Sequence, residues 1–555
     1  MNAKKKFDHS NDLVLLPLGG VGEIGMNCYC YGVGPAHDRE WLMVDLGVKF
    51  GDESEPGIDI VLPDLGHIVG ERRRLSGLVL THAHEDHLGA VAWLWPQLNC
   101  PVYCTPFAAE ILAGKLKERG IDERVPVHVK PVGSRFDVGS FTVELVSVTH
   151  SIPEPTALFI ETKQGRVLHS GDWKIDRTPM MGGGFDEKRF REIGELGVDA
   201  LVCDSTNVFR EGFSVSEAEV AANLDRIVSE AKNRIAVTTF ASHVERISSA
   251  VAAARKAGRE VVIAGRAMRQ TIEAARACGY LRDAGSFLEE EAFGYLPPDK
   301  IMLLCTGSQG EPRAAIARIA EDIHPAIALD DGDLVVFSSK TIPGNEKAVS
   351  AVHNNLARLG VDVITSDDAL VHTSGHPRQD ELKLLYGWLN PRAVIPMHGE
   401  ARHLLRHMEL AEDAGIEETV MAENGDIVRL CPGPVQIVDE APSGRLHVDG
   451  KLIVPAIEGP AKYRRKLSFV GIVVASLVID HKGSLVTDIE IIADGLPSGL
   501  EERLRDAADE AFDSMPRSRR ASDETVAETL RVAIRRAADA EWGKKPICRV
   551  LVHRL

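Results

Sequence analysis

Several features that would place a chain in other classes of protein are missing from this sequence. Among its 555 residues, no apolar run reaches the roughly 18 residues that a membrane-spanning helix needs. No apolar stretch follows the basic start MNAKKKFDHSND, so we expect no signal peptide. There is no internal repeat and no low-complexity tract. The hydrophobic fraction of 44% and the charged fraction of 26% exclude a mainly disordered or collagen-like chain.

Paired cysteines and an excess of positive charge are also missing. The 9 cysteines are scattered, odd in number and form no C-x-x-C pair. We interpret them as buried free thiols of a cytoplasmic protein rather than a disulfide framework or a zinc knuckle. Lys+Arg 64 against Asp+Glu 82 gives a net charge of −18, which at first argues against a nucleic-acid partner.

The order of predicted elements indicates an α/β protein with an insertion. Strands alternate with helices from the start, with polar residues just past the strand ends. From about residue 211 a regular βα pattern predicts a separate parallel-sheet domain, after which a histidine-rich α/β pattern resumes. A Pro/Gly-rich passage then predicts an exit toward a linker. We expect an α/β domain in two parts (1–212 and 373–445), an inserted α/β domain (213–372), a linker (446–462) and a C-terminal α+β domain (463–555).

The most informative stretch is T-H-A-H-E-D-H, residues 81–87, directly after an apolar strand. His82 and His84 alternate along an extended loop, so both can face one cation. Asp86 and His87 follow where the loop enters a helix, so they can face a second cation beside the first. Imidazole and carboxylate ligands suit zinc or manganese.

Two metals need more ligands than this loop supplies. His150 ends VELVSVTH, Asp172 lies in HSGDWK, and His398 lies in VIPMHGE, each after a β-rich run. A carboxylate between two metals can bridge them, which is the role we expect for Asp172. Each of these residues alone would more often cap a turn, but together with the loop they complete two sites.

These motifs resemble a known group of enzymes over about residues 10 to 555. THAHEDH, His150, Asp172 and the strand ending in Asp45 resemble the metallo-β-lactamase fold. CDSTN with Asp204, HTSGH with His376 and IPMHGE with His398 resemble the additional motifs of the β-CASP nucleases. SSKTIPGNE and the hundred-residue tail are most similar to the bacterial ribonuclease J family. The resemblance implies a metallo-β-lactamase αββα sandwich with an inserted β-CASP domain.

The resemblance also implies roles for individual residues. His82, His84 and His150 would hold one metal, and Asp86, His87 and His398 the other, with Asp172 shared. Asp204 would orient a ligand, Asp45 would support the loop, and His376 would contact the scissile phosphate and assist the departing oxygen. The two divalent ions would be Zn²⁺, with Mn²⁺ or Mg²⁺ possible. Hydroxide held by the metals would then attack phosphorus, and no protein nucleophile is needed.

By the same resemblance, the chain would be a ribonuclease of RNA maturation and decay. It would combine 5′-to-3′ exonuclease and endonuclease action on single-stranded RNA, with a preference for 5′-monophosphate ends. Candidate phosphate contacts are Ser374, Gly375 and His376 in HTSGH, and Ser242 and His243 just before a predicted helix. At this last segment the family pattern has Asn and then His-Arg, so the match there is incomplete. A homodimer or homotetramer through the C-terminal domain and an RNA-degradation complex are the implied partners.

The acidic balance does not forbid RNA. Between residues 226 and 282 there are eleven Lys/Arg against four Asp/Glu, a local balance of +7. We expect this stretch to wall an RNA channel, with binding confined there. The alternatives are a hydrolase of small thioesters or lactams, a β-CASP nuclease acting on DNA, and a non-catalytic RNA-binding subunit. The inserted domain argues against the hydrolase of small substrates, and the retained His398 argues against the DNA nuclease. The complete ligand set argues against the non-catalytic subunit.

Overall fold

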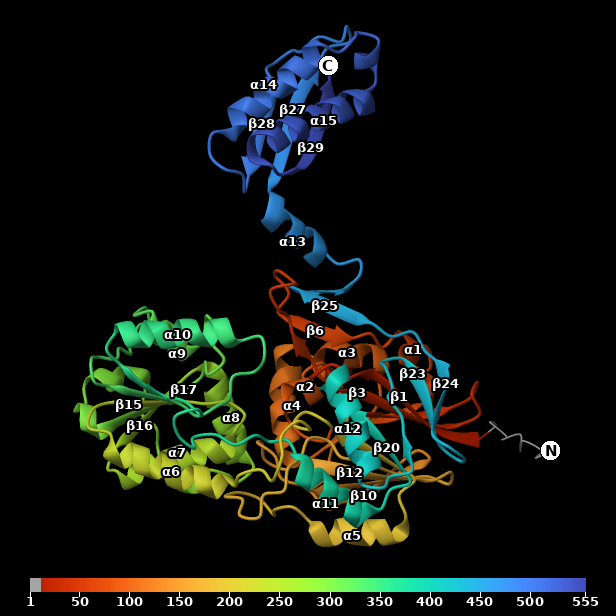
Figure 1. Ribbon diagram of the computed structural model, residues 1–555, viewed down its shortest axis with the longest axis vertical. Helices are drawn as coiled ribbons and strands as arrows, with labels where there is room; N and C mark the ends of the chain where they lie inside the picture. The colour runs from red at the N-terminus through yellow and green to blue at the C-terminus, as the bar shows by residue number, and fades with distance from the viewer. Residues whose placement is uncertain (1–10) are drawn as a thin grey trace, which may run out of the picture. The chain divides into compact units, whose positions relative to one another are not determined.

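The computed structural model describes residues 11–555, so the basic start of the chain lies outside the described residues (Figure 1). Contacts divide the chain into two compact units, one made of residues 11–49 and 61–446 and the other of residues 50–60 and 447–555. Within residues 11–555 no helix is long and apolar enough to cross a membrane.

The first unit is built on two sheets that face each other. β1 is buried at all eight positions, because a sheet covered on both faces needs apolar residues on both sides of each strand. The first sheet has eight strands, in the order β24 (Gln436–Glu440), β23 (Asp426–Cys431), β1 (Asp12–Gly19), β3 (Cys28–Gly34), β4 (Glu40–Val44), β7 (Leu75–Val79), β8 (Val102–Cys104) and β9 (Val127–Val129). The second has seven, in the order β10 (Arg135–Val138), β11 (Phe141–Ser147), β12 (Thr156–Glu161), β13 (Arg166–His169), β14 (Ala200–Asp204), β20 (Ala393–Met397) and β22 (Glu418–Thr419).

Helices cover the outer faces of both sheets, which confirms the expected αββα sandwich. Leu13 and Leu15 of the first sheet and Val143 and Leu145 of the second belong to one buried cluster between the sheets. A second cluster joins the other face of the second sheet to its covering helices. These helices are α5 (Glu187–Leu196), α11 (Gln379–Leu389) and α12 (Ala401–Asp413). The helices that follow strands of the first sheet are α2 (Glu85–Leu88), α3 (Val91–Leu98) and α4 (Pro106–Glu118), and α1 (Gly66–Gly70) precedes its strand β7.

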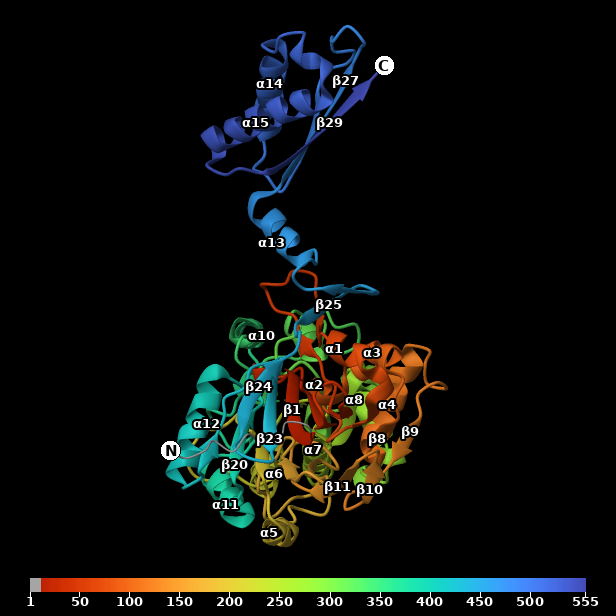
Figure 2. The same cartoon turned by 90° about the vertical axis from the view of Figure 1, so that its right-hand side faces the viewer.

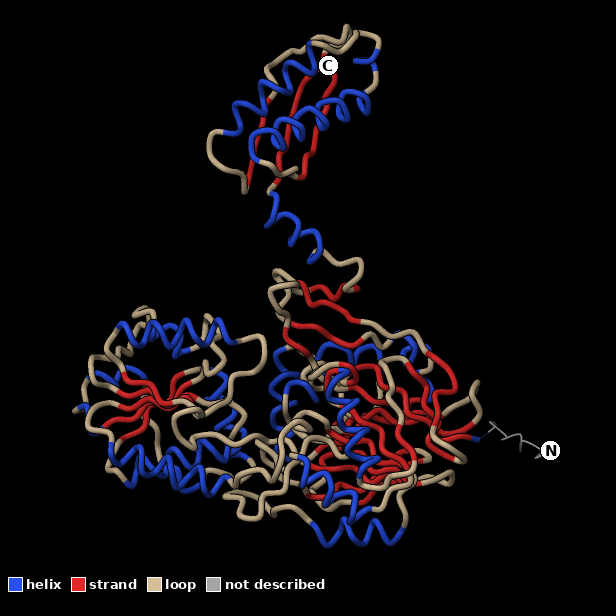
Figure 3. Tube along the Cα trace, in the orientation of Figure 1, coloured by secondary structure: helices blue, strands red, loops and turns tan. Residues whose placement is uncertain are grey.

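The inserted domain has a five-stranded parallel sheet of its own. Figures 1 and 3 show α9 and α10 on one face of this sheet and α6 and α7 on the other. The order is β16 (Glu260–Ala264), β17 (Ile301–Cys305), β15 (Ile235–Thr238), β18 (Leu334–Phe337) and β19 (Asp362–Ile364). The helices are α6 (Glu217–Glu230), α7 (Val244–Lys256), α8 (Arg266–Ala277), α9 (Ala315–Ala320) and α10 (Glu346–Arg358).

The C-terminal domain is a three-stranded sheet with helices on one face only, as Figure 2 shows. Its core lies between the sheet and the helices, and it confirms the expected α+β tail. The strands are β27 (Ile472–Ile479), β28 (Glu490–Asp494) and β29 (Ile547–Arg554), and the helices are α14 (Leu500–Asp513) and α15 (Asp523–Trp542). The remaining short elements are β2 (Val21–Gly22), β5 (Lys49–Phe50), β6 (Ile60–Pro63), β21 (Gly399–Glu400), β25 (Arg445–Asp449), β26 (Leu452–Pro455), α13 (Ala461–Val470) and five 3₁₀ turns in the described residues.

Candidate metal centre

Seven histidine and aspartate side chains meet where strands of the two facing sheets end. They come from the loops after β7, β11, β13 and β20 and from the short helix α2 that follows β7, because a strand end is where the backbone can turn a polar side chain toward a neighbouring loop. Two groups of them have ligand atoms within 4.8 Å of one another, close enough to hold a metal ion. The first group is His82, His84 and His150; the second is Asp86, His87, Asp172 and His398.

The first group presents three imidazole nitrogens to one point. Nδ1 of His84 lies 3.2 Å from Nε2 of His82 and 3.0 Å from Nε2 of His150. Nδ1 of His150 lies 2.6 Å from the carbonyl oxygen of Gly375, so it carries the proton and its Nε2 lone pair faces the group. Burial lowers the pKa of all three rings, that of His84 to about 4, so they are neutral near pH 7. Three ring nitrogens that converge on one point, with no carboxylate among them, fit a metal ion.

The second group is rich in negative charge. Nε2 of His87 lies 3.3 Å from Oδ2 of Asp172, and Nε2 of His398 lies 3.3 Å from Oδ2 of Asp86. Burial opposes protonation of both rings, but the carboxylates outweigh it and raise the pKa of His87 well above its usual value and that of His398 to about 10. The group therefore attracts positive charge, which a divalent cation supplies better than a proton. Among the described residues, Nε2 of His398 is buried and makes no well-aligned hydrogen bond, although Asp86 lies 3.3 Å away, which fits an atom that binds a metal ion.

Asp45 lies behind this second group and does not point into it. Its Oδ2 is 2.7 Å from Nδ1 of His87, and its Oδ1 accepts the backbone N–H of Thr81 at 2.8 Å. The carboxylate thus fixes the His87 tautomer and the start of the loop together. Asp45 and His398 both have φ in the left-handed region, at 60° and 51°, so the backbone is strained at two positions of the site.

Asp204 and His376 form a third arrangement beside the metal-ligand groups. Nδ1 of His376 lies 2.7 Å from Oδ2 of Asp204, and the His376 ring is 5.1 Å from that of His150. Burial lowers the pKa of His376, but Asp204 and Asp172 outweigh it and raise the pKa. The His376 side chain is 20% exposed against 2% for Asp172. His376 is therefore on the side that a substrate can reach.

The candidate phosphate contacts are placed differently from one another. Ser374 is half-buried, and its Oγ accepts a hydrogen bond from Nδ2 of Asn207 at 2.8 Å. Gly375 is buried against His150, and a Cβ there would lie 2.4 Å from Nδ1 of that ring. Ser242 is half-buried before α7.

His243 is fully buried, with Nε2 3.2 Å from Glu217 and Nδ1 accepting the N–H of Arg246. In this structure the His243 ring faces protein groups on both nitrogens, so it does not itself reach the surface.

Three positioning residues were missed in the sequence. Nδ2 of Asn27 lies 3.0 Å from Nε2 of His87. Nδ2 of Asn207 also donates to the carbonyl oxygen of His376 at 3.1 Å. The carboxylate of Glu381 is 0% exposed and accepts hydrogen bonds from the N–H groups of Ile175, Ser214 and Arg378. Asn207 lies inside CDSTN and could have been found there, whereas Glu381 has the pattern of an ordinary helix-capping residue.

The facing sheets and the histidine and aspartate groups at their edge define a metallohydrolase of the metallo-β-lactamase class. Comparison with known proteins agrees region by region. Residues 24–188 match the metallo-beta-lactamase superfamily, residues 232–356 the ribonuclease J beta-CASP domain, residues 361–422 the Zn-dependent metallo-hydrolase RNA specificity domain, and residues 462–555 the ribonuclease J C-terminal domain.

Relatives that match along most of the chain identify its family more closely. The chain is 47% identical to ribonuclease J of Sinorhizobium meliloti, over 99% of both chains. It is 37% identical to ribonuclease J of Corynebacterium glutamicum (97% of this chain, 75% of the relative) and 37% to that of Thermus thermophilus (83% and 81%). A solved structure of a protein of unknown function from Enterococcus faecalis shares the fold, with a TM-score of 0.50, 16% identity, and coverage of 75% of this chain and 100% of that one. The chain belongs to the ribonuclease J family and is a metallohydrolase.

Proposed function

We propose that the protein is a two-metal ribonuclease that degrades single-stranded RNA from the 5′ end and also cuts it internally, with a preference for 5′-monophosphate ends. The observation that carries this is the pair of histidine and aspartate groups with His376 and Asp204 beside them, in a chain of the ribonuclease J family. It would serve RNA maturation and decay.

We propose two divalent ions per chain, Zn²⁺ first and Mn²⁺ or Mg²⁺ as alternatives. His82, His84 and His150 would hold one ion, and Asp86, His87 and His398 the other, with Asp172 between them. When bound, the ions would supply an activated water and neutralise charge on the phosphate oxygens. Groups of the chain itself would orient the ligands and protect the site. Asp45 and the Gly375 carbonyl hold two imidazole rings in place, and the buried loops exclude bulk water.

His376 would act on the departing oxygen. Asp204 accepts a hydrogen bond from Nδ1–H of His376 and fixes the ring, so that Nε2–H would contact the scissile phosphate and give its proton to the leaving 3′ oxygen. Ser374 and Gly375 would hold the phosphate beside it. Ser242 would contact RNA at the start of α7, and His243 would act only indirectly, because its ring is buried.

One assay tests this function. Purified protein with Zn²⁺ or Mn²⁺ receives RNA of one sequence with either a 5′-monophosphate or a 5′-triphosphate. Release of mononucleotides mainly from the monophosphate RNA is expected, with internal cuts in both. Hydrolysis of a thioester without cleavage of either RNA would overturn the proposal, and so would cleavage confined to DNA.

We propose that the chain forms a homodimer or homotetramer through the C-terminal domain, acts in the cytoplasm and takes part in an RNA-degradation complex. The uncovered face of the three-stranded sheet supports the oligomer, since Ile492 of β28 is 63% exposed and Leu551 of β29 is 49% exposed. The nine free cysteines support the location. Solution mass of an Ile492→Asp and Leu551→Asp double variant tests the interface: an unchanged mass would contradict it.

We also propose domain boundaries at residues 212/213, 372/373, 445/446 and 462/463. The change of sheet between β14 and β15 and the return of the chain before β20 support the first two. Limited proteolysis with mass spectrometry of the fragments tests them, with first cuts expected between residues 446 and 462.

A further inference from the structure

The basic stretch 226–282 does not present its excess charge to a ligand. Most of its arginines and lysines pair with carboxylates that lie outside the counted window, or with carbonyl oxygens. Arg246 bonds Glu217, Lys256 bonds Asp225, and Arg266 bonds Glu118. Arg259 donates to four backbone carbonyls. The local balance of +7 is therefore largely cancelled once the chain is folded, and a cationic surface for RNA has to be sought elsewhere.

Three cations near His376 form no such pairs. Among residues 11–555, the side chains of Arg210, Lys340 and Arg378 make no ion pair and no hydrogen bond, whereas most buried or half-buried arginines of the chain make at least one. Arg210 and Lys340 are exposed and Arg378 is half-buried, so a ligand can reach all three.

The backbone brings these three residues together around the segment that carries His376. The carbonyl oxygen of Arg210 accepts the N–H of Gln379 at 3.0 Å, so it lies beside the residue after Arg378. Lys340 comes two residues after Ser338, whose Oγ donates to the carbonyl oxygen of Val371 at 2.7 Å. Arg210 and Arg378 thus belong to the two parts of the first domain, and Lys340 belongs to the inserted domain.

Their charges repel one another. Partial desolvation beside neighbouring side chains lowers the pKa of Lys340, although it remains accessible, and the guanidinium groups of Arg210 and Arg378 lower it further, with only a weaker opposing effect from Asp367. Clustered like charges destabilise a fold unless they serve a ligand of opposite sign. In a protein of net charge −18, these three cations beside the candidate catalytic histidine are the strongest indication of a site for an anionic ligand.

We propose that Arg210, Lys340 and Arg378 form an auxiliary phosphate site that holds the backbone of the substrate RNA at a nucleotide next to the scissile one. This rests on the proposed function. We assign a phosphodiester rather than a base edge, because most protein contacts to nucleic acids go to phosphate and sugar, and three clustered cations complement the charge that every nucleotide carries. The site would strengthen RNA binding without sequence preference and would align the strand across the boundary between the two domains.

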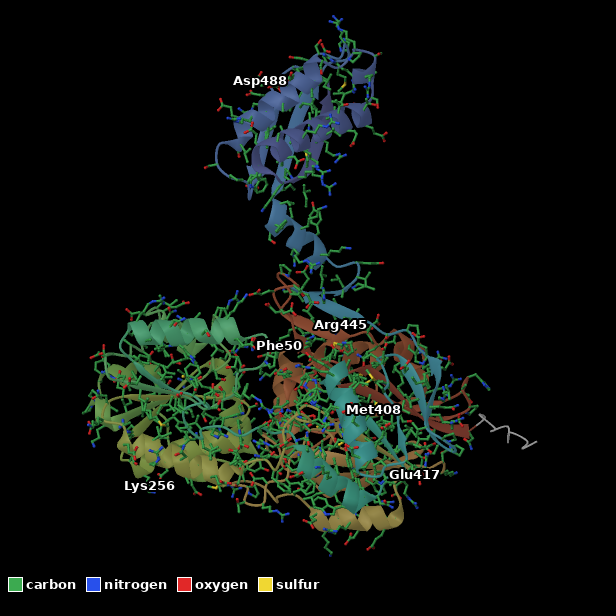
Figure 4. All side chains as sticks on the ribbon, in the orientation of Figure 1. Phe50, Lys256, Met408, Glu417, Arg445 and Asp488 are labelled. Carbon is green, nitrogen blue, oxygen red and sulfur yellow. The ribbon has the colours of Figure 1, made fainter. Side chains whose placement is uncertain are left out.

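The test uses the metal-loaded, full-length protein with Arg210→Gln, Lys340→Gln and Arg378→Gln, singly and combined. Controls are Lys256→Gln and Arg226→Gln, which remove cations of the inserted domain that already pair with Asp225 and Glu230. Figure 4 labels Lys256 on the outer surface of that domain. The readouts are anisotropy of a labelled 2′-O-methyl RNA over a salt series, and kcat and KM on 5′-monophosphate RNA.

Each single variant is expected to raise KM several-fold with kcat within about twofold, and the triple variant to flatten the slope of log affinity against log salt by about 2, at about 0.7 per lost contact to single-stranded RNA. A triple variant whose salt slope and KM equal those of the control variants would overturn the site. Because binding is measured apart from cleavage, a wild-type protein that binds RNA with this salt slope but does not cut it would overturn the proposed function and leave the site standing.

Discussion

At the scale of single residues, the candidate metal centre depends on which ring nitrogen carries a proton. The carbonyl oxygen of Gly375 accepts a hydrogen bond from Nδ1–H of His150, and the carboxylate of Asp45 accepts one from Nδ1–H of His87, so Nε2 is the ring atom turned toward the metal-ligand groups. Burial keeps the rings of the first group neutral, while aspartates surround the rings of the second. The two groups of imidazoles would therefore favour a metal ion for different reasons: burial keeps the first group unprotonated, and negative charge surrounds the second.

Replacing His84 tests the first group at this scale. His84→Ala removes the nitrogen on which His82 and His150 converge, so we expect loss of about one metal equivalent per chain. The expected fall in kcat is at least about 100-fold, since loss of an outer partner alone costs 10–100-fold. Metal content by mass spectrometry and cleavage of 5′-monophosphate RNA check this, with His481→Ala, in the C-terminal domain, as the control. Activity near wild type would refute the metal assignment.

Glu245 gives a second prediction at the residue scale. Burial, with a smaller effect of Glu217, raises the pKa of Glu245 to about 7, and its carboxylate accepts the N–H of Met180. The pKa of Glu245 is higher in the folded state than in the unfolded state, so the folded state takes up a proton. The stability that the protonated carboxyl group contributes is therefore lost as pH rises from about 4.5 to 7. We expect Glu245→Gln, which keeps the acceptor, to raise the melting temperature relative to wild type by a few degrees at pH 8 and by less at pH 5. A difference that does not grow with pH would contradict the shifted pKa.

At the scale of elements, the two crossings between the first domain and the inserted domain are fastened together on the side of the first domain. Glu381, at the start of α11, accepts hydrogen bonds from the loop after Asp172, from Ser214 on the outgoing crossing and from Arg378 on the returning one. The hydroxyl of Thr373 adds a bond to the carbonyl of Val215 at 2.8 Å. His376 is thereby held to the first domain, so movement of the inserted domain would leave it beside Asp204.

Substituting Glu381 tests this clamp. Glu381→Ala removes the acceptor of three backbone N–H groups, which costs about 1–3 kcal/mol for each group that water does not reach. Glu381→Gln keeps one carbonyl acceptor and should lose less. We expect both to lower kcat more than they raise KM, with the order Ala below Gln below wild type, in steady-state assays at a temperature where circular dichroism shows all three folded. Equal kcat in all three would show that the clamp does not position His376.

At the scale of the whole molecule, two units have separate hydrophobic cores. Both metal-ligand groups lie in the unit of residues 11–49 and 61–446, while the C-terminal domain has its own cluster between one sheet and two helices. Metal binding should therefore stabilise one unit and not the other, because a ligand stabilises only the part that binds it.

Chelation checks this division. Removing metal with EDTA is expected to lower the melting temperature of the larger unit by several degrees, since each ion present at 1,000 times its Kd contributes about 4 kcal/mol. The transition of the C-terminal domain should not move. Differential scanning calorimetry before and after chelation, with Zn²⁺ added back as the control, measures both. A single transition that shifts as a whole would contradict independent units.

Local sequence determined the ligand types, their spacing and the order of domains. Four of the candidate ligands lie close together in one segment of the sequence: His82, His84, Asp86 and His87. Strand periodicity marks the neighbouring strand ends, so short-range sequence patterns were sufficient to predict this part of the site. Tertiary structure alone decided that Glu381 joins three segments, that the basic stretch 226–282 is largely neutralised, and that Arg210, Lys340 and Arg378 lie close together without forming an ion pair within residues 11–555. The physical reason is that a charge count treats residues as independent, whereas ion pairing, burial and hydrogen bonding depend on partners that are distant in sequence.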